Sequence, residues 1–248
     1  MTHPDSHVAE VRSLHESGLN ASEIAALTGI SRSTLRHWIG LTQRSPTPPW
    51  VSCPRCNVEA ELDDAAYVYL LGLYLGDGCI SKQPKDVWRL RIFQTAKYTE
   101  HVEECAVAMH AVLPNNVLIQ QRQGCVEIGA SSKHWPCLFP QVGAGRKHER
   151  PIVLAPWQQW HAERYPHLLL RGLIQSDGCR DNNWVTSKGR RYEYPRYTFS
   201  NASDDIRRIF TDACDLLSVH WTHPSARVIS IARRDDVAYL DTFIGPKC

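Results

Sequence analysis

Two apolar stretches, about one hundred positions apart, each end in Asp-Gly-Cys. The first, LLGLYLGDGC, covers residues 70–79, and the second, LLRGLIQSDGC, covers residues 169–179. Continuous apolar segments of this length that stop at a glycine predict two buried helices. Burial alone does not explain why an aspartate follows each helix.

Small residues recur on one face of each predicted helix. Gly72 and Gly76 are four positions apart, as are Gly172 and Ser176. Residues four apart lie on the same side of a helix, and small ones allow two backbones to approach closely. We therefore expect these four residues to form an interface at which both helices end side by side.

From residue 63 onward the hydrophobic pattern occurs twice. In each copy the apolar helix is followed by a strand pattern, an amphipathic helix, a second strand pattern and a short helix. The first strand pattern is VWRLRIFQTA in one copy and YPRYTFSNAS in the other, and the second is CVEIGASS and RVISIARR. The amphipathic helix is TEHVEECAVAMHAVL and SDDIRRIFTDACDLLSV, and the short helix is KHWPCLF and DDVAYLDTF. Two αββαββα-like units, over residues 63–150 and 151–248, predict an α+β fold and a monomer with internal pseudo-twofold symmetry.

Three short helical patterns, separated by glycine turns, occupy residues 1–40. Ser22 and Ser31 are the expected N-caps of the second and third helices. The pattern resembles a helix-turn-helix, in which the last helix enters the major groove of DNA. A plain three-helix bundle is the alternative. The resemblance implies DNA contacts by Arg32, Ser33, Thr34, Arg36 and His37. Residues 41–62 then contain several prolines and are expected to form a linker.

The linker ends near a CPRC motif. Cys53 and Cys56 have the spacing of half a zinc site, so Zn²⁺ is a possible ligand. No second CxxC or HxxxH pattern supplies the other half. Cys137, with either His134 or His148, could complete the site only through the fold, and a metal-free turn is the alternative.

Composition adds few constraints. A formal charge of +2 and a pI near 8.1 are only weakly basic, so bulk charge does not identify a nucleic-acid partner. Nine cysteines are an odd number and are typical of reduced thiols in a reducing compartment. No apolar run approaches the roughly 20 residues needed to cross a bilayer. We expect a cytoplasmic protein without a membrane partner.

Asp77 and Asp177 would meet if the two helices end side by side. Two nearby carboxylates raise each other's proton affinity unless a cation lies between them. Carboxylate oxygens suit Mg²⁺, which leaves its other positions to water and phosphate. The pair therefore predicts a magnesium site, and the alternative is that each aspartate only caps or solvates its helix end.

The motifs LLGLYLGDG and LRGLIQSDG resemble the nine-residue motif of the LAGLIDADG homing endonuclease family. Asp77 and Asp177 stand at the eighth position, where that family has its metal-binding acid. The resemblance covers residues 63–248. It implies two saddle-shaped antiparallel sheets along double-stranded DNA and Mg²⁺-dependent hydrolysis of both strands. The chain departs from the family name at the sixth position, where Leu75 and Gln175 replace aspartate.

The same resemblance assigns further residues. Lys147 and Lys247, each 70 positions after its aspartate, align with a catalytic lysine of the family. Lys97 and Ser203 fall near another polar position that supports the solvent network. The basic residues expected to contact DNA from the sheets and their borders are Arg89, Arg91, Lys97, Arg122, Arg196, Arg233 and Arg234.

The strand VWRLRIFQTA leaves one alternative open. Leu90 and Ile92 alternate with Arg89 and Arg91, which favours an apolar core face and an arginine face. In the family, one row of strand side chains reads the DNA bases. If Gln94 belongs to that row, the face with Leu90 and Ile92 would point to DNA, and the assignment of the two faces would be reversed.

Two functions are consistent with the sequence. One is a sequence-specific, Mg²⁺-dependent double-strand DNA endonuclease whose helix-turn-helix adds a second DNA contact. The other is a non-cutting transcriptional regulator on the same frame, as in WhiA-type regulators, whose helix-turn-helix lies on the carboxyl side. The paired acids favour the endonuclease, and the recognition helix favours the regulator.

Overall fold

The computed structural model describes residues 5–39, 53–57 and 59–245. The chain divides into two compact units, Met1–Val51 and Ser52–Cys248, so that the CPRC motif belongs to the second unit. Lys247 and most of the expected linker lie outside the described residues. Over the described ranges, no helix combines the length and the apolar character that spanning a membrane requires.

The first unit consists of three helices around a small apolar core. These are α1 (Asp5–Glu16), α2 (Ala21–Thr28) and α3 (Arg32–Trp38). Val11, Ile24 and Leu35 are fully buried between them, one from each helix. The N-cap of α2 is Asn20 and not Ser22, because the Asn20 side chain accepts hydrogen bonds from two amides of the first turn. The three expected helices are present, and their use as a helix-turn-helix stays a prediction.

The second unit contains two copies of one arrangement. The first copy has α4 (Asp64–Leu75), β1 (Gly78–Gln83), β2 (Val87–Gln94), α5 (Thr99–Val112), β3 (Val117–Arg122), β4 (Cys125–Ser132) and α6 (Trp135–Leu138). The second copy has α8 (Pro166–Asp177), β5 (Gly178–Ser187), β6 (Arg190–Ser200), α9 (Asp204–Leu216), β7 (Thr222–Ser225), β8 (Val228–Ile231) and α10 (Arg234–Asp241). Helix α7 (Pro156–Arg164) precedes the second copy, and a 3-10 turn, η2 (Lys147–Glu149), ends the first.

Each copy forms one antiparallel sheet with the same strand order. The sheets run β1-β2-β4-β3 and β5-β6-β8-β7. Two four-stranded sheets in αββαββα-like repeats confirm the predicted α+β fold. Because successive strand side chains alternate between faces, each sheet buries one apolar row against its helices.

The core side of β2 settles the question left open by its sequence. Leu90 and Ile92 are fully buried, and Gln94 on the same face is 5% exposed. Arg89 and Arg91 therefore lie on the face directed away from the core. The apolar-core assignment is correct, and Gln94 belongs to the core row.

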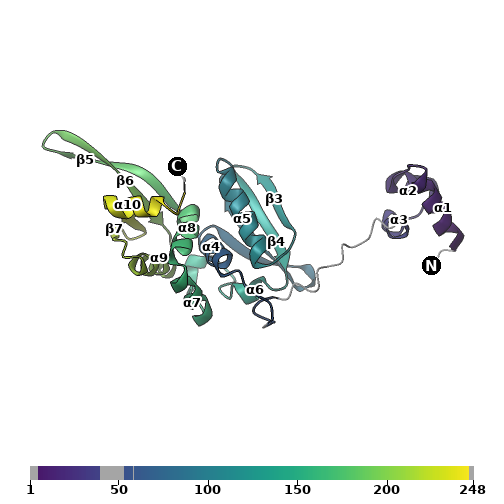
Figure 1. Ribbon diagram of the computed structural model, residues 1–248, viewed down its shortest axis with the longest axis horizontal. Helices are drawn as coiled ribbons and strands as arrows, with labels where there is room; N and C mark the ends of the chain where they lie inside the picture. The colour runs from purple at the N-terminus through teal and green to yellow at the C-terminus, as the bar shows by residue number, and fades with distance from the viewer. Residues whose placement is uncertain (1–4, 40–52, 58, 246–248) are drawn as a thin grey trace. The chain divides into compact units, whose positions relative to one another are not determined.

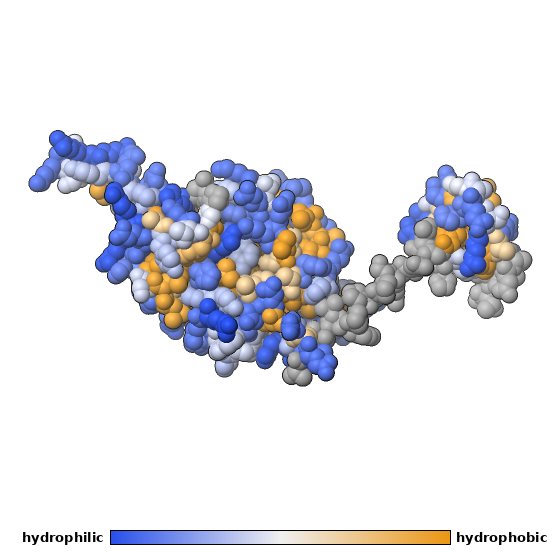
Figure 2. All heavy atoms as spheres, viewed as in Figure 1, coloured by the Kyte–Doolittle hydropathy of each residue, from blue (hydrophilic) through white to orange (hydrophobic). Residues whose placement is uncertain are grey.

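The hairpin of β5 and β6 is longer than its counterpart in the first copy. Strand β6 pairs with β8 only over residues 197–200, so the outer part of the hairpin is a two-stranded arm (Figure 1). Lys188 and Gly189 both have positive φ, which suits the tight turn at its tip. Trp184 and Tyr192 are about half exposed there, and the visible surface of the arm is largely hydrophilic (Figure 2).

Helices α4 and α8 lie side by side between the two sheets (Figure 1). Their backbones touch at Gly72 and Gly172. A Cβ at Gly72 would lie 2.9 Å from the Gly172 Cα, and a Cβ at Gly172 would lie 2.3 Å from the Tyr69 carbonyl oxygen. Side chains cannot fit at these distances, so the glycines are required for the helix contact.

Substitution of Gly172 tests this contact. Because the added methyl would meet backbone atoms of α4, we expect Gly172→Ala to lower the free energy of unfolding by about 1–3 kcal/mol. Urea denaturation of the full chain measures this. The matched control is Gly143→Ala, because the three atoms nearest to its added methyl, at 3.3–3.4 Å, belong to the Arg150 side chain and not to a backbone. If Gly172→Ala is as stable as Gly143→Ala, α4 and α8 can move apart to accept the methyl without a loss of stability, and the close contact is not required.

Candidate active site

Both motif helices pass directly into a strand, and an aspartate stands at each transition. Asp77 and Asp177 are half-buried, and Gly78 and Gly178 begin β1 and β5. A Cβ at Gly78 would lie 2.5 Å from the Tyr74 Cα, and a Cβ at Gly178 would lie 2.7 Å from the Ile174 Cα. The glycine after each aspartate thus lets the strand turn back over the helix end, which holds the carboxylate at that end.

The contact between the helices continues to the aspartates. A Cβ at Gly76 would lie 2.0 Å from the Ser176 Oγ and 3.1 Å from an oxygen of Asp177. The Asp177 carboxylate therefore lies against the end of α4, next to the residue that precedes Asp77. Both carboxylates also act electrostatically on the ammonium of Lys147. The structure brings these three charged groups to one place.

Lys147 reaches the end of α4 from the turn η2. Its Nζ donates hydrogen bonds to carbonyl oxygens that the helix leaves unpaired, which is a favourable position for a cation. The distances are 2.5 Å to Tyr74, 2.7 Å to Leu75 and 2.6 Å to Gly76. Burial lowers the pKa of Lys147 to about 8, while the charges of Asp177 and Asp77 act to raise it. Lys247 lies outside the described residues.

Asn201 is a site residue that the sequence analysis missed. Its Nδ2 donates to the Asp177 Oδ2 at 2.6 Å, and its Oδ1 accepts from the Ser203 amide at 2.8 Å. Asn201, Asp177 and Lys147 line a cavity of about 230 Å³ together with His148. The available indication was its place directly after β6, the strand that pairs with β5 beside the motif.

Lys97 and Ser203, both expected near a polar position that supports the solvent network, have different surroundings in the structure. Ser203 is buried and caps α9 through its hydroxyl, which accepts from the Ile206 amide at 3.4 Å. Lys97 is exposed, with its Nζ 5.3 Å from the centre of the Tyr98 ring. Ser203 supports the site indirectly, because its amide holds Asn201.

The sixth motif position is structural in both copies. Leu75 is fully buried in the core. Gln175 is also buried, and it accepts from the Tyr69 hydroxyl at 2.5 Å and donates to the Ile244 carbonyl at 3.0 Å. Both side chains therefore serve packing, and Gln175 links the two copies.

Arginines on the outward face of the first sheet are arranged around one acid. Glu127 accepts from Arg89 at 2.9 Å and from Arg122 at 2.8 Å, and its side chain is 4% exposed. Burial would raise the pKa of Glu127, but the hydrogen bonds and charges of Arg122 and Arg89 outweigh it and lower the pKa. Arg91 donates to the Ser81 hydroxyl at 3.2 Å. The guanidinium groups are thus held in place, and their charge is partly compensated.

The second sheet has a similar pair. Arg196 donates to Asp181 across the β5–β6 hairpin at 3.0 Å. Arg233 and Arg234 are exposed at the start of α10. The hairpin pair fixes one guanidinium on this face, whereas the two arginines at α10 are open to solvent.

In the first unit, the expected DNA-contacting residues lie on α3. Arg32 and Arg36 are exposed, and Arg32 donates to the Ser22 hydroxyl at 3.4 Å. The hydroxyls of Ser33 and Thr34 both bond with the Ser31 hydroxyl at the helix start. The side chain of His37 is outside the described atoms.

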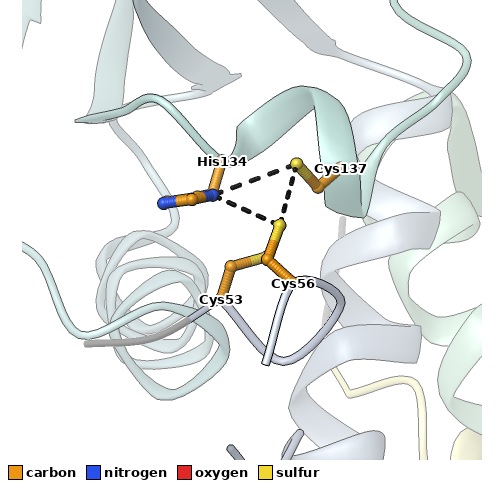
Figure 3. A group of neighbouring side chains, drawn as sticks. All are labelled: Cys53, Cys56, His134 and Cys137. Atoms are coloured by element: carbon orange, nitrogen blue, oxygen red, sulfur yellow. Dashed lines mark hydrogen bonds between the residues drawn. The ribbon is translucent and has the colours of Figure 1, made fainter. Parts of the chain in front are cut away.

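The CPRC cysteines meet the end of the first repeat. Cys53, Cys56, His134 and Cys137 place their ligand atoms within 4.8 Å of one another (Figure 3). His148, the other candidate histidine, lines the cavity beside Asp177 instead. A second candidate metal centre, separate from the aspartate site, is therefore built from two distant segments.

No family model matches the sequence, and no protein of curated function is similar to it at a significant level. Among solved structures, mesophilic variants of the homing endonuclease I-DmoI are similar in fold, with 16% identity over 74% of this chain and 97% of that chain (TM-score 0.48). The LAGLIDADG meganuclease I-AabMI bound to uncleaved DNA shares 10% identity over 71% and 82% (TM-score 0.46).

A third similar structure is the N-terminal LAGLIDADG domain of DUF199/WhiA, with 13% identity over 77% of this chain and 86% of that chain (TM-score 0.46). At such low identities the likeness concerns the fold. The functional proposal has to rest on the residues of this chain.

The charge balance around Lys147 can be measured by NMR, because the chain has only seven lysines. We expect the ¹³Cε resonance of Lys147 to titrate near pH 8, below the ordinary lysine value. Asp177→Asn removes a charge that raises this pKa, so it should lower the midpoint further. Asp235→Asn, at an exposed acid on α10, should leave the midpoint unchanged. An ordinary lysine midpoint would mean that the ammonium is not held between helix end and carboxylates.

Proposed function

We propose that the protein is a sequence-specific, double-strand DNA endonuclease that uses Asp77 and Asp177 as its acids. The observation that carries the proposal is the approach of α4 and α8, which brings both helix ends together beside Lys147. The two motifs that resemble the LAGLIDADG sequence are the same two helices. A duplicated site suits a substrate with two antiparallel strands, since each acid would serve one strand.

The residues at the helix ends fit a divalent cation. Two carboxylates act on the Lys147 ammonium from neighbouring helix ends, and carboxylate oxygens are the ligands that Mg²⁺ prefers. Asp77 and Asp177 would hold the ion, which when bound supplies Lewis-acid activation of water and phosphate. One oxygen of Asp177 is oriented by the amide of Asn201.

The protein groups around the acids have separate roles. Lys147, fixed on the carbonyl oxygens of α4, keeps a positive charge beside the position of a bound phosphate. Its lowered pKa allows it to exchange a proton near neutral pH. Asn201 keeps the Asp177 carboxylate aimed at the cavity that it shares with Lys147.

The outward faces of the two sheets are the proposed DNA-binding surface. Arg91 and the pairs of Arg89 with Glu127 and Arg196 with Asp181 lie on these faces. A guanidinium that is already oriented by a carboxylate keeps further N–H donors for a phosphate or a guanine edge. The extended β5–β6 arm adds contact length on one side.

The three-helix unit is the proposed second DNA contact. The exposed Arg32 and Arg36 on α3 would bind phosphates or bases in the major groove. Two DNA contacts on one chain raise the affinity for a target that fits both.

A non-cutting regulator is the second candidate. The observation that favours it is that the charged groups already have protein partners, since Asn201 binds Asp177 and Lys147 binds the end of α4. Such a site is satisfied without a cation. The regulator would use the same sheets and α3 for sequence-specific binding.

Cleavage of a randomised duplex library distinguishes the two. With Mg²⁺, we expect the wild type to cut a subset of sequences, and Asp77→Asn and Asp177→Asn to lower the cut fraction by about a hundredfold or more. Both variants should still bind the selected sequences, because the sheets are unchanged. Bound and cut fractions are counted separately by sequencing.

The control variant is Asp235→Asn, which removes an exposed acid on α10 and should cut like the wild type. Specific binding by the wild type without cleavage would identify the regulator. Cleavage that persists in both aspartate variants would contradict the assigned acids.

The contribution of α3 can be measured on a selected target. Arg32→Ala with Arg36→Ala should weaken binding and reduce the slope of log affinity against log salt by about 1 for each lost phosphate contact. The charge-matched control, Arg164→Ala with Arg208→Ala, removes two arginines from α7 and α9 and should leave the slope unchanged. If both double variants bind equally, α3 does not contact DNA.

A further inference from the structure

We propose that Cys53, Cys56, His134 and Cys137 bind one Zn²⁺, and that this ion fastens the segment at the start of the second unit to the end of the first repeat. The site is independent of the proposed endonuclease activity. It would be structural, because four protein ligands leave no open position on the metal.

The distances among the ligand atoms of Cys56, His134 and Cys137 are close to those of a zinc tetrahedron, and the Cys53 Sγ lies within 4.8 Å of each of them. Zn–S bonds of about 2.3 Å and Zn–N bonds of about 2.0–2.1 Å require roughly 3.8 Å between sulfurs and roughly 3.6 Å between sulfur and nitrogen. The Cys56 Sγ lies 3.5 Å from the Cys137 Sγ and 3.6 Å from the His134 Nδ1. The Cys137 Sγ lies 3.9 Å from the same nitrogen.

The two ligand pairs are carried by similar turns. In the first, the Cys56 amide donates to the Cys53 carbonyl at 2.8 Å, and in the second the Cys137 amide donates to the His134 carbonyl at 3.0 Å. Each pair has two residues between its ligands, so each turn points both ligands to the same side (Figure 3). The amides of Arg55 and Cys56 also donate hydrogen bonds to the Cys53 thiol, which hold its sulfur within the turn.

A disulfide does not explain the cluster. The sulfurs of Cys56 and Cys137 are 3.5 Å apart, whereas a disulfide bond is about 2.05 Å long. A Cys56–Cys137 bond would also leave Cys53 and the His134 ring without a role. Metal binding uses all four groups: three thiols lose their protons, three Zn–S bonds and one Zn–N bond form, and no electron is transferred.

The fastening role follows from the other contacts of the turn. The second ligand pair is firmly held, because Trp135 is buried and its indole donates to the Ala130 carbonyl at 2.9 Å. In contrast, residues 53–57 are bonded to the second ligand pair through the Cys56 thiol, and Asn57 accepts from the neighbouring amides of Glu59 and Ala60. Arg55 adds a contact over the Trp157 ring at 4.3 Å. The ion would thus supply most of the attachment of this turn.

Metal content of the full chain tests the site. We expect one zinc per chain by elemental analysis of protein purified without an affinity tag that binds metal. Cobalt in place of zinc should give the strong visible absorption of a tetrahedral thiolate site. Cys56→Ser and His134→Ala should lose the metal, whereas His134→Cys should retain it, because four cysteines also form a structural zinc site. Cys125→Ser, at a cysteine outside the cluster, should behave like the wild type.

The fastening role has its own readout. Trypsin should cut after Arg55 slowly in the zinc-loaded protein and at least severalfold faster after chelation, while His134→Cys should stay protected. Wild-type protein without zinc, retention of the metal by Cys56→Ser, or a disulfide among these cysteines in freshly purified protein would overturn the site. Zinc content with unchanged proteolysis would overturn the fastening role. Each of these results is independent of whether the protein cuts DNA.

Discussion

The contact between the backbones of α4 and α8 is the constraint on which the rest of the second unit depends. Because Gly72 and Gly172 have no side chains, each helix comes within van der Waals distance of the other's main chain. This approach places the two αββαββα repeats on opposite sides of one axis. It also places Asp77 and Asp177 at neighbouring helix ends, so a single packing contact sets both the symmetry of the fold and the geometry of the site.

The described polar groups of the site come unequally from the two repeats, while Lys247, the counterpart of Lys147 in sequence, lies outside the described residues. Lys147 caps α4 on one side, whereas Asn201 orients Asp177 on the other. Gln175 adds a further difference, because its buried amide joins the Tyr69 hydroxyl of the first repeat to the end of the second.

The strongly patterned elements were predictable from sequence, and β4 occupies the expected residues 125–132. Strand β7, with the sequence THPS, has no apolar alternation and contains Pro224, which is tolerated because β7 is an edge strand. Partners far apart in sequence were not predictable: Asn201 meets Asp177 only because β5 and β6 pair. The sequence also does not decide whether His134 or His148 joins the cysteines, because only the fold places His134 beside them.

Acids accompany several of the arginines on the outward faces of the sheets. Glu127 is bonded to both Arg89 and Arg122, and Asp181 is bonded to Arg196. Such pairs reduce the attraction for phosphates at any sequence, but they orient the guanidinium groups that remain able to donate. Because the formal charge is only +2, affinity for DNA in the proposed function would depend on fit to the target and on a second contact. In the proposed function α3 provides that contact.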